Sequence, residues 1–175
     1  MASLGDLTLI LSSFQAASDG DVEGGAIASN SASVPSGKDL FLFATTSKPS
    51  GQGVTRTYKK MFFKNNASGL VAQAKLWIDA QERSPQIKVA HEENGAGAKV
   101  LNGTDSTNSP ATKPANLTLT DFTLATSSTT ALQAAGDGSL PAGAAWGIWV
   151  LREISEALLA DSSVPVIFKI SAANP

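Results

Sequence analysis

The side chains best suited to catalysis or metal binding are few in this sequence. His91, in the segment HEENG, is the single histidine, and the chain has no cysteine. A His-Glu-x-x-His zinc site needs a second histidine. A Ser-His-Asp triad would have to use His91, and the Gly-x-Ser-x-Gly turn that carries the serine in many hydrolases is missing. We therefore expect His91 to lie in a solvated loop.

Acidic residues offer a second kind of chemistry. Asp19, Asp21 and Glu23 alternate in SDGDVEGG, a spacing that resembles part of a calcium loop but lacks the twelve-position pattern with its terminal Glu. Asp and Gly are also ordinary turn residues. Paired carboxylates for glycoside hydrolysis stay open, although no two acids share an obvious strand face. We predict no catalytic, metal-binding or cofactor-binding residues, and hence no enzyme.

Composition narrows the class of protein. The 175 residues suit one domain spanning 1–175, which can include a short N-terminal arm at 1–6. With 13 basic and 15 acidic residues the net charge is −2, which predicts no nucleic-acid partner. The apolar run Leu7–Leu11 is too short for a signal core, and no run approaches the roughly 18 residues of a membrane span. We expect a soluble protein made in the cytoplasm, which the absence of cysteine also fits.

The elements that would position these residues are mostly strands, because apolar residues alternate at period two. A short helix is expected at most once, at residues 154–160. The pattern is typical of an all-β antiparallel β-sandwich, Ig-like or jelly-roll-like, with long loops. The predicted strands are 7–11, 40–44, 54–65, 72–78, 116–124, 146–154 and 164–170, with weaker candidates at 87–90 and 98–101.

Alternation also gives each predicted strand two faces. Large side chains on both faces of 54–65 predict a strand that is central or covered. In 54–65, Tyr58 and Phe62 share one face, and Met61 and Phe63 share the other. In the next strand, one face carries Ala72, Ala74, Leu76 and Ile78, and the other carries Val71, Gln73, Lys75 and Trp77. In the last strand, Val164, Val166, Phe168 and Ile170 form one apolar face.

Aromatic residues and long loops are the candidate contact surfaces. Trp146 and Trp149 differ in parity, so one is expected in the core and the other at an interface, unless the sheet is covered on both faces. Segments 102–115 and 125–145 read as long loops without regular structure, either disordered or ordered against a neighbouring subunit. The predicted interface residues are Trp77, Trp149, Thr104, Asp105, Ser106, Thr107, Asn108 and Lys113.

Several segments, taken in order, resemble a known type of protein. They are EGGAIAS at 23–29, TYKKMFFKNNASGLVAQAKLWID at 57–79 and PAGAAWGIWVLREI at 141–154. Together they are similar to a recurring type of small virion structural protein of tailed bacteriophages. The connection after Arg152, ISEALLADSS, departs from the short turn usual in that family. The matching residues are Gly24, Gly25, Ala26, Ile27, Tyr58, Lys59, Lys60, Phe62, Lys64, Asn65, Ala74, Lys75, Trp77, Ile78, Trp149 and Arg152.

The resemblance implies a function in an assembly. It suggests a capsid decoration (cement) protein in the virion that binds the outside of the head, bridges copies of the major capsid protein and forms a homotrimer. A tail, baseplate or neck component of the virion is the first alternative. A carbohydrate-binding adhesion module, using Trp77 or Trp149 over a polar groove, is the second. Neither nucleic acid nor membrane is an expected partner.

Overall fold

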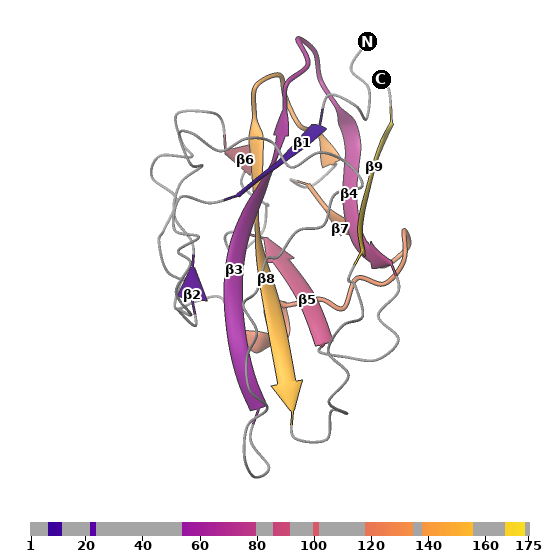
Figure 1. The fold of residues 1–175 in the computed structure, drawn as a ribbon. Coiled ribbons are helices and arrows are strands. Elements are labelled where there is room, and N and C mark those ends of the chain that lie inside the picture. The colour runs from indigo at the N-terminus through magenta and orange to yellow at the C-terminus, as the bar shows by residue number, and fades with distance from the viewer. Residues whose placement is uncertain are drawn as a thin grey trace.

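A computed structural model describes residues 7–11, 22–23, 54–79, 86–91, 100–101, 118–134, 138–155 and 167–173. These residues form mostly antiparallel β-strands in two sheets (Figure 1), with almost no helix beyond a 3-10 turn, η3 (Leu119–Asp121). The predicted all-β class is confirmed. Among the described residues, no helix has the length and apolar character needed to cross a membrane.

The larger sheet is built around two long strands. β3 and β8 pair antiparallel along their whole length, from Val54 opposite Ser155 to Lys64 opposite Ala145. β1 and β2 pair with the other edge of β3, and β5 and β6 pair with the other edge of β8. The prediction that residues 54–65 form a central strand is therefore confirmed. The strands are β1 (Leu7–Leu11), β2 (Val22–Glu23), β3 (Val54–Asn65), β5 (Gln86–His91), β6 (Val100–Leu101) and β8 (Ala145–Ser155).

The smaller sheet has three strands, with β4 (Ala72–Asp79) between β7 (Leu132–Gln133) and β9 (Ile167–Ala173). Both pairings are antiparallel. Lys75 of β4 lies opposite Gln133 on one side and opposite Ser171 on the other. Directly opposed residues share one face of a sheet, so this register sets three polar residues side by side.

Side chains from both sheets meet in one core cluster. Met61 of β3, Trp146 and Ile148 of β8, and Leu76 and Ile78 of β4 are all buried in it. Each buried Leu or Ile side chain of this kind contributes about 1.5–3 kcal/mol through removal of apolar surface from water. Phe168 and Ile170 of β9 pack against the same cluster but remain partly exposed. The predicted inward faces of β4 and β9 are thus correct at these positions.

The opposite face of the larger sheet is also covered. Trp149 and Leu151 form a second buried cluster with Phe122, and Tyr58 packs against it. Trp146 and Trp149 are both 0% exposed. Lys60 is fully buried on this face as well, with its Nζ 5.4 Å from the centroid of the Trp149 ring. Both tryptophans are therefore buried within the chain, which is the alternative expected when the sheet is covered on both faces; strand parity gives the face of a side chain but not what covers that face.

A β-bulge breaks the alternation of β4. The register with β9 shifts between Ala72 and Lys75, and Gln73 has a φ of 52°. Val71 is consequently buried, although its parity placed it with the exposed residues. Gly138, at a φ of 84°, lies against this bulge, where an added Cβ would be 2.7 Å from the Gln73 Cα.

Residues 118–145 differ most from the sequence predictions. The alternating segment 116–124 is not a continuous strand in its described part, because Thr118 and Asp121 form the capping box of η3 and Thr123 makes only an isolated bridge to Val89. The segment 125–145 is not a loop without structure. Its described residues contain β7 and the buried side chains of Ala125, Leu132, Ala134, Leu140 and Ala144.

Asn65 ties the β3–β4 connection to this same segment. Its buried side-chain Nδ2 lies within hydrogen-bond distance of the carbonyl oxygens of Gly69 and Leu140 at 2.9 Å and of Pro141 at 3.1 Å. Its Oδ1 accepts from the Ala67 amide at 2.9 Å. The polar turn between the two strands is therefore fixed by a core side chain.

Other predictions fall outside the described residues. These are the N-terminal arm 1–6, the acidic positions 19 and 21, the matched segment 24–27, the strand 40–44, the loop 102–115, the helical segment after residue 155, and residues 164–166.

Candidate functional site

The smaller sheet turns one face toward the core and the other toward solvent. Even-numbered residues of β4 from Ala74 onward are buried, whereas the odd-numbered ones are half-buried or exposed. We call the solvent side the polar face and define it by Gln73, Lys75, Trp77, Asp79, Lys169 and Ser171. Because of the bulge at Gln73, Val71 is buried and the polar face starts at Gln73.

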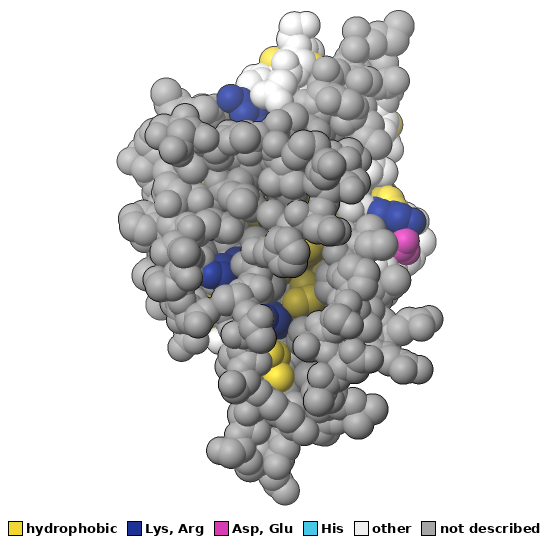
Figure 2. Space-filling model, viewed as in Figure 1, with side chains coloured by type: hydrophobic (Ala, Val, Ile, Leu, Met, Phe, Trp, Pro, Cys, Tyr) yellow, Lys and Arg dark blue, Asp and Glu magenta, His cyan; other side chains and the backbone are white. Residues whose placement is uncertain are grey.

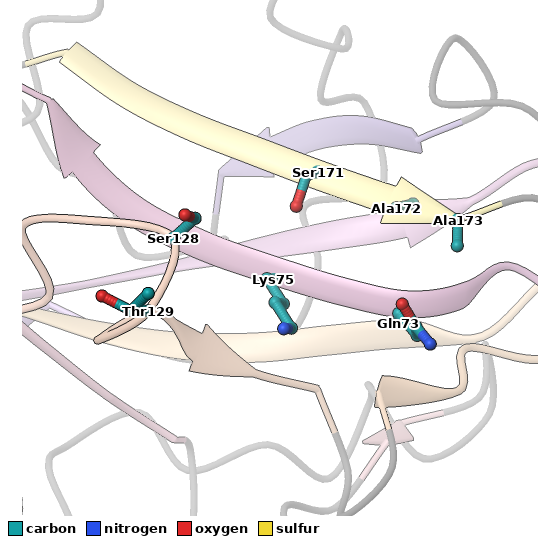
Figure 3. A pocket seen from close by; sticks show the side chains of 7 residues that line it. All are labelled: Gln73, Lys75, Ser128, Thr129, Ser171, Ala172 and Ala173. Carbon is teal, nitrogen blue, oxygen red and sulfur yellow. The ribbon is translucent and has the colours of Figure 1, made fainter.

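A cavity of about 480 Å³ opens on the polar face. Figure 3 shows Lys75 in the middle of its lining, with the turn carrying Ser128 and Thr129 on one side and Gln73 on the other. Five of the seven lining residues carry polar side chains, and the cavity is open to solvent. It consists of Gln73, Lys75, Ser128, Thr129, Ser171, Ala172 and Ala173.

The turn beside the cavity is held by its own hydroxyl groups. The backbone amides of Thr126 and Ser127 each donate to Thr130 Oγ1 at 3.1 Å. The Thr130 amide donates to the Ser127 carbonyl at 3.2 Å. Ser127 Oγ lies 2.8 Å from Thr129 Oγ1. Because Ser127 and Thr130 close the turn, the exposed side chain of Ser128 is available to a ligand at the cavity rim.

The charge of the polar face is concentrated at Lys75. Lys169 and Asp79 form an ion pair at 2.5 Å, so their charges largely cancel. Lys75 forms no ion pair within the part of the chain that the structure describes. The cavity therefore combines one uncompensated ammonium group with hydroxyl and amide groups that donate hydrogen bonds.

Two of the predicted interface residues can be placed. Trp77 lies on the polar face opposite Lys169, half-buried, and packs in part against the core. Trp149 is buried, as described above. The loop residues Thr104, Asp105, Ser106, Thr107, Asn108 and Lys113 lie outside the described residues.

His91 differs from its prediction. It is the last residue of β5 rather than part of a solvated loop, and its Nδ1 accepts a hydrogen bond from Trp146 Nε1 at 3.3 Å. Burial lowers the pKa of His91 below its ordinary value of 6.5, because the interior disfavours the charged ring. The contact joins the end of β5 to β8.

A separate charged group lies across the larger sheet. Glu153 Oε1 accepts from Arg56 at 2.8 Å, and Glu153 Oε2 accepts from Lys88 at 2.6 Å. Burial tends to raise the pKa of Glu153, but hydrogen bonds and charge from Lys88 and Arg56 outweigh it and lower the pKa. This network joins β3, β8 and β5. Among the described residues, no three His, Cys, Asp or Glu side chains gather as they would for a metal ion.

The described polar face offers a positive charge and hydrogen-bond donors to a ligand. On the face seen in Figure 2, described basic side chains are scattered rather than gathered in one patch. Sequence reasoning missed Ser128, Thr129 and Ser171, since no motif marks them. The register of β4 and β9 brings Ser171 to Lys75, and the turn at residues 127–130 brings Ser128 and Thr129 to the same cavity. Comparisons with protein-family models, curated proteins and solved structures found no match.

Proposed function

We propose that the protein is a structural component of a phage virion and, more specifically, a capsid decoration protein. It binds the outside of the assembled head and bridges neighbouring copies of the major capsid protein. The two sheets are those of a β-sandwich, and the protein acts as a homotrimer. Its function is energetic, because burial of interface area holds the shell together.

One observation carries this proposal: most of the described residues that carry the resemblance are buried in the interior of the molecule. Lys60 and Trp149 lie directly opposite each other on β3 and β8 and make a cation–π contact. Asn65 holds the β3–β4 turn and Ile78 fills the core. A shared sequence pattern of this kind specifies a scaffold, which is what a family of assembly proteins with varied surfaces requires.

The smaller sheet provides a second observation that supports the proposal. Its polar face presents Lys75 and Trp77 of β4 side by side with Ser171 and Lys169 of β9. Aromatic residues with a surrounding polar rim are common at protein interfaces. The same face also suits the alternative of a carbohydrate-binding module, for which Trp77 would be the aromatic platform and the cavity the polar groove.

The binding mode predicts a dependence on assembly. A protein that bridges several subunits makes several weak contacts at once, and linking them raises the overall affinity by roughly 10²–10⁴. Purified protein should therefore co-sediment with expanded capsids and bind isolated capsid subunits poorly. Equal binding to both would contradict a bridging function.

Location in the particle separates the candidates. Gold-labelled antibody should decorate the heads of virions in electron micrographs. Label confined to the tail tip or neck would replace the capsid proposal with the tail alternative. Particles without label, together with retention of the protein on a glycan array, would favour the carbohydrate-binding alternative.

A further inference from the structure

The cavity around Lys75 places one positive charge among side chains that can donate hydrogen bonds. Lys75 lies in a row with Gln133 and Ser171 across the three strands, and the Ser128–Thr129 turn lies at one side. The ammonium group and the hydroxyl groups can all donate to a single acceptor. A carboxylate offers two oxygens with about four acceptor sites and a single charge, which matches this set.

The shape of the cavity indicates where the carboxylate comes from. Pockets for small molecules are mostly apolar and enclose most of the ligand surface. This cavity is open, five of its seven lining residues carry polar side chains, and it adjoins the polar face with half-buried Trp77. Such a site fits a side chain that projects from the surface of another protein, while the rest of that surface rests on the sheet.

We propose that this cavity binds an Asp or Glu side chain on a loop of the partner protein. The identification of that partner as a capsid protein rests on the proposed function, whereas the recognition of a carboxylate does not. Lys75 supplies the charge, and Ser171 and the Ser128–Thr129 turn supply hydrogen bonds. The adjacent Lys169 instead forms an ion pair with Asp79 at 2.5 Å, which joins β4 to β9.

The test of carboxylate recognition is a titration followed by NMR. Capped glutamate, capped glutamine and N-acetylglucosamine are added separately to the full-length protein at millimolar concentration. Capped glutamate should shift the amide signals of Gln73, Lys75 and Ser171, and capped glutamine should shift them much less. Equal shifts with both amino acids, or no shift with either, would overturn the proposal. Shifts with the sugar alone would assign the cavity to carbohydrate instead.

Two matched variants extend the test to the partner. Lys75→Gln and Lys169→Gln each remove one positive charge from the same sheet face. A hydrogen bond to a charged group contributes enough that its loss weakens binding about tenfold or more. Lys75→Gln should therefore lose about tenfold in binding to expanded capsids, and Lys169→Gln should stay within about twofold of the wild type. Unchanged far-UV circular dichroism shows that both variants are folded.

The two arms separate the two proposals. If the wild type binds capsids and Lys75→Gln binds equally well, the cavity proposal fails and the proposed function stands. If capped glutamate binds in the NMR titration but the wild type does not co-sediment with capsids, the cavity is a carboxylate site and the proposed function fails. An equal loss in both variants would show a general effect of charge and would overturn the assignment to Lys75.

Discussion

Asn65 gives the sharpest test of how this fold is held together. Its amide has four contacts, three from Nδ2 to carbonyl oxygens and one from the Ala67 amide to Oδ1. The two amide hydrogens share three acceptors, so we count three bonds in total. At about 1 kcal/mol net for each bond, Asn65→Ala should lower the free energy of unfolding by about 3 kcal/mol.

The assay is urea denaturation followed by tryptophan fluorescence. A lower midpoint at constant slope reports a loss of stability alone. For a chain of this size a loss of about 3 kcal/mol corresponds to a fall in Tm of roughly 6–12 °C. Ser68→Ala, an exposed change in the same turn, is the control and should stay within about 0.5 kcal/mol of the wild type.

Asn65→Asp tests the same reasoning with a side chain of equal size. It keeps the acceptor for Ala67 but directs a carboxylate oxygen at the carbonyl groups of Gly69, Leu140 and Pro141. The variant should be at least as unstable as Asn65→Ala at neutral pH, and part of the loss should be recovered in acid, where the carboxyl group again donates. A loss below about 1 kcal/mol in both variants would refute the assigned function of the amide.

Three further predictions concern a titrating group, a core side chain and a backbone position. Burial lowers the pKa of His91, so as the pH falls the unfolded chain takes up a proton on His91 before the folded protein does. The free energy of unfolding should therefore fall as pH drops below 6.5 toward the lower pKa of the folded protein. His91→Gln should flatten this pH dependence in urea midpoints measured across that range. Phe168 is only partly buried, so Phe168→Ala should cost about 1–2 kcal/mol in the same assay, and a loss of 3 or more, typical of fully buried Phe, would show that the exposed side of β9 is covered. Gly138→Ala should cost about 2 kcal/mol or more, because φ is positive and a Cβ meets backbone at 2.7 Å, whereas Gly69→Ala, with nothing within 4 Å, should be nearly neutral in thermal melts.

Alternation predicted the long strands well because it reports on burial. β3 has the predicted bounds, and β8 begins one residue before its predicted start and ends one residue beyond its predicted end. The signal fails where a turn supplies its own hydrogen bonds. In the segment from Thr118 to Asp121, the Thr-x-x-Asp capping box was present in the sequence and outweighed the alternation of NLTLTDFTL.

The candidate site could not be predicted, for a different reason. Strand parity placed Lys75 and Trp77 on one face of β4 correctly, but it gives no information on which strand lies beside them. Ser171 is brought to Lys75 by the register of β9, and Ser128 by a turn more than fifty residues away along the chain. The sequence likewise gave no sign that a bulge at Gln73 would bury Val71.

β4 contributes side chains both to the core and to the polar face. Because these side chains alternate along the strand, stability and partner binding can be tested separately. Leu76 and Ile78 are fully buried, so truncating either to Ala should cost about 2–5 kcal/mol of stability. Lys75 is on the opposite face, where a change to Gln removes a charge and no core contact. If the polar face binds a partner, even-numbered substitutions should lower the free energy of unfolding and reduce binding only through unfolding. Lys75→Gln should reduce binding at unchanged stability. A stability loss from Lys75→Gln as large as that from Leu76→Ala would mean that Lys75 is a structural residue. The proposal that the polar face binds a partner would then lose its support.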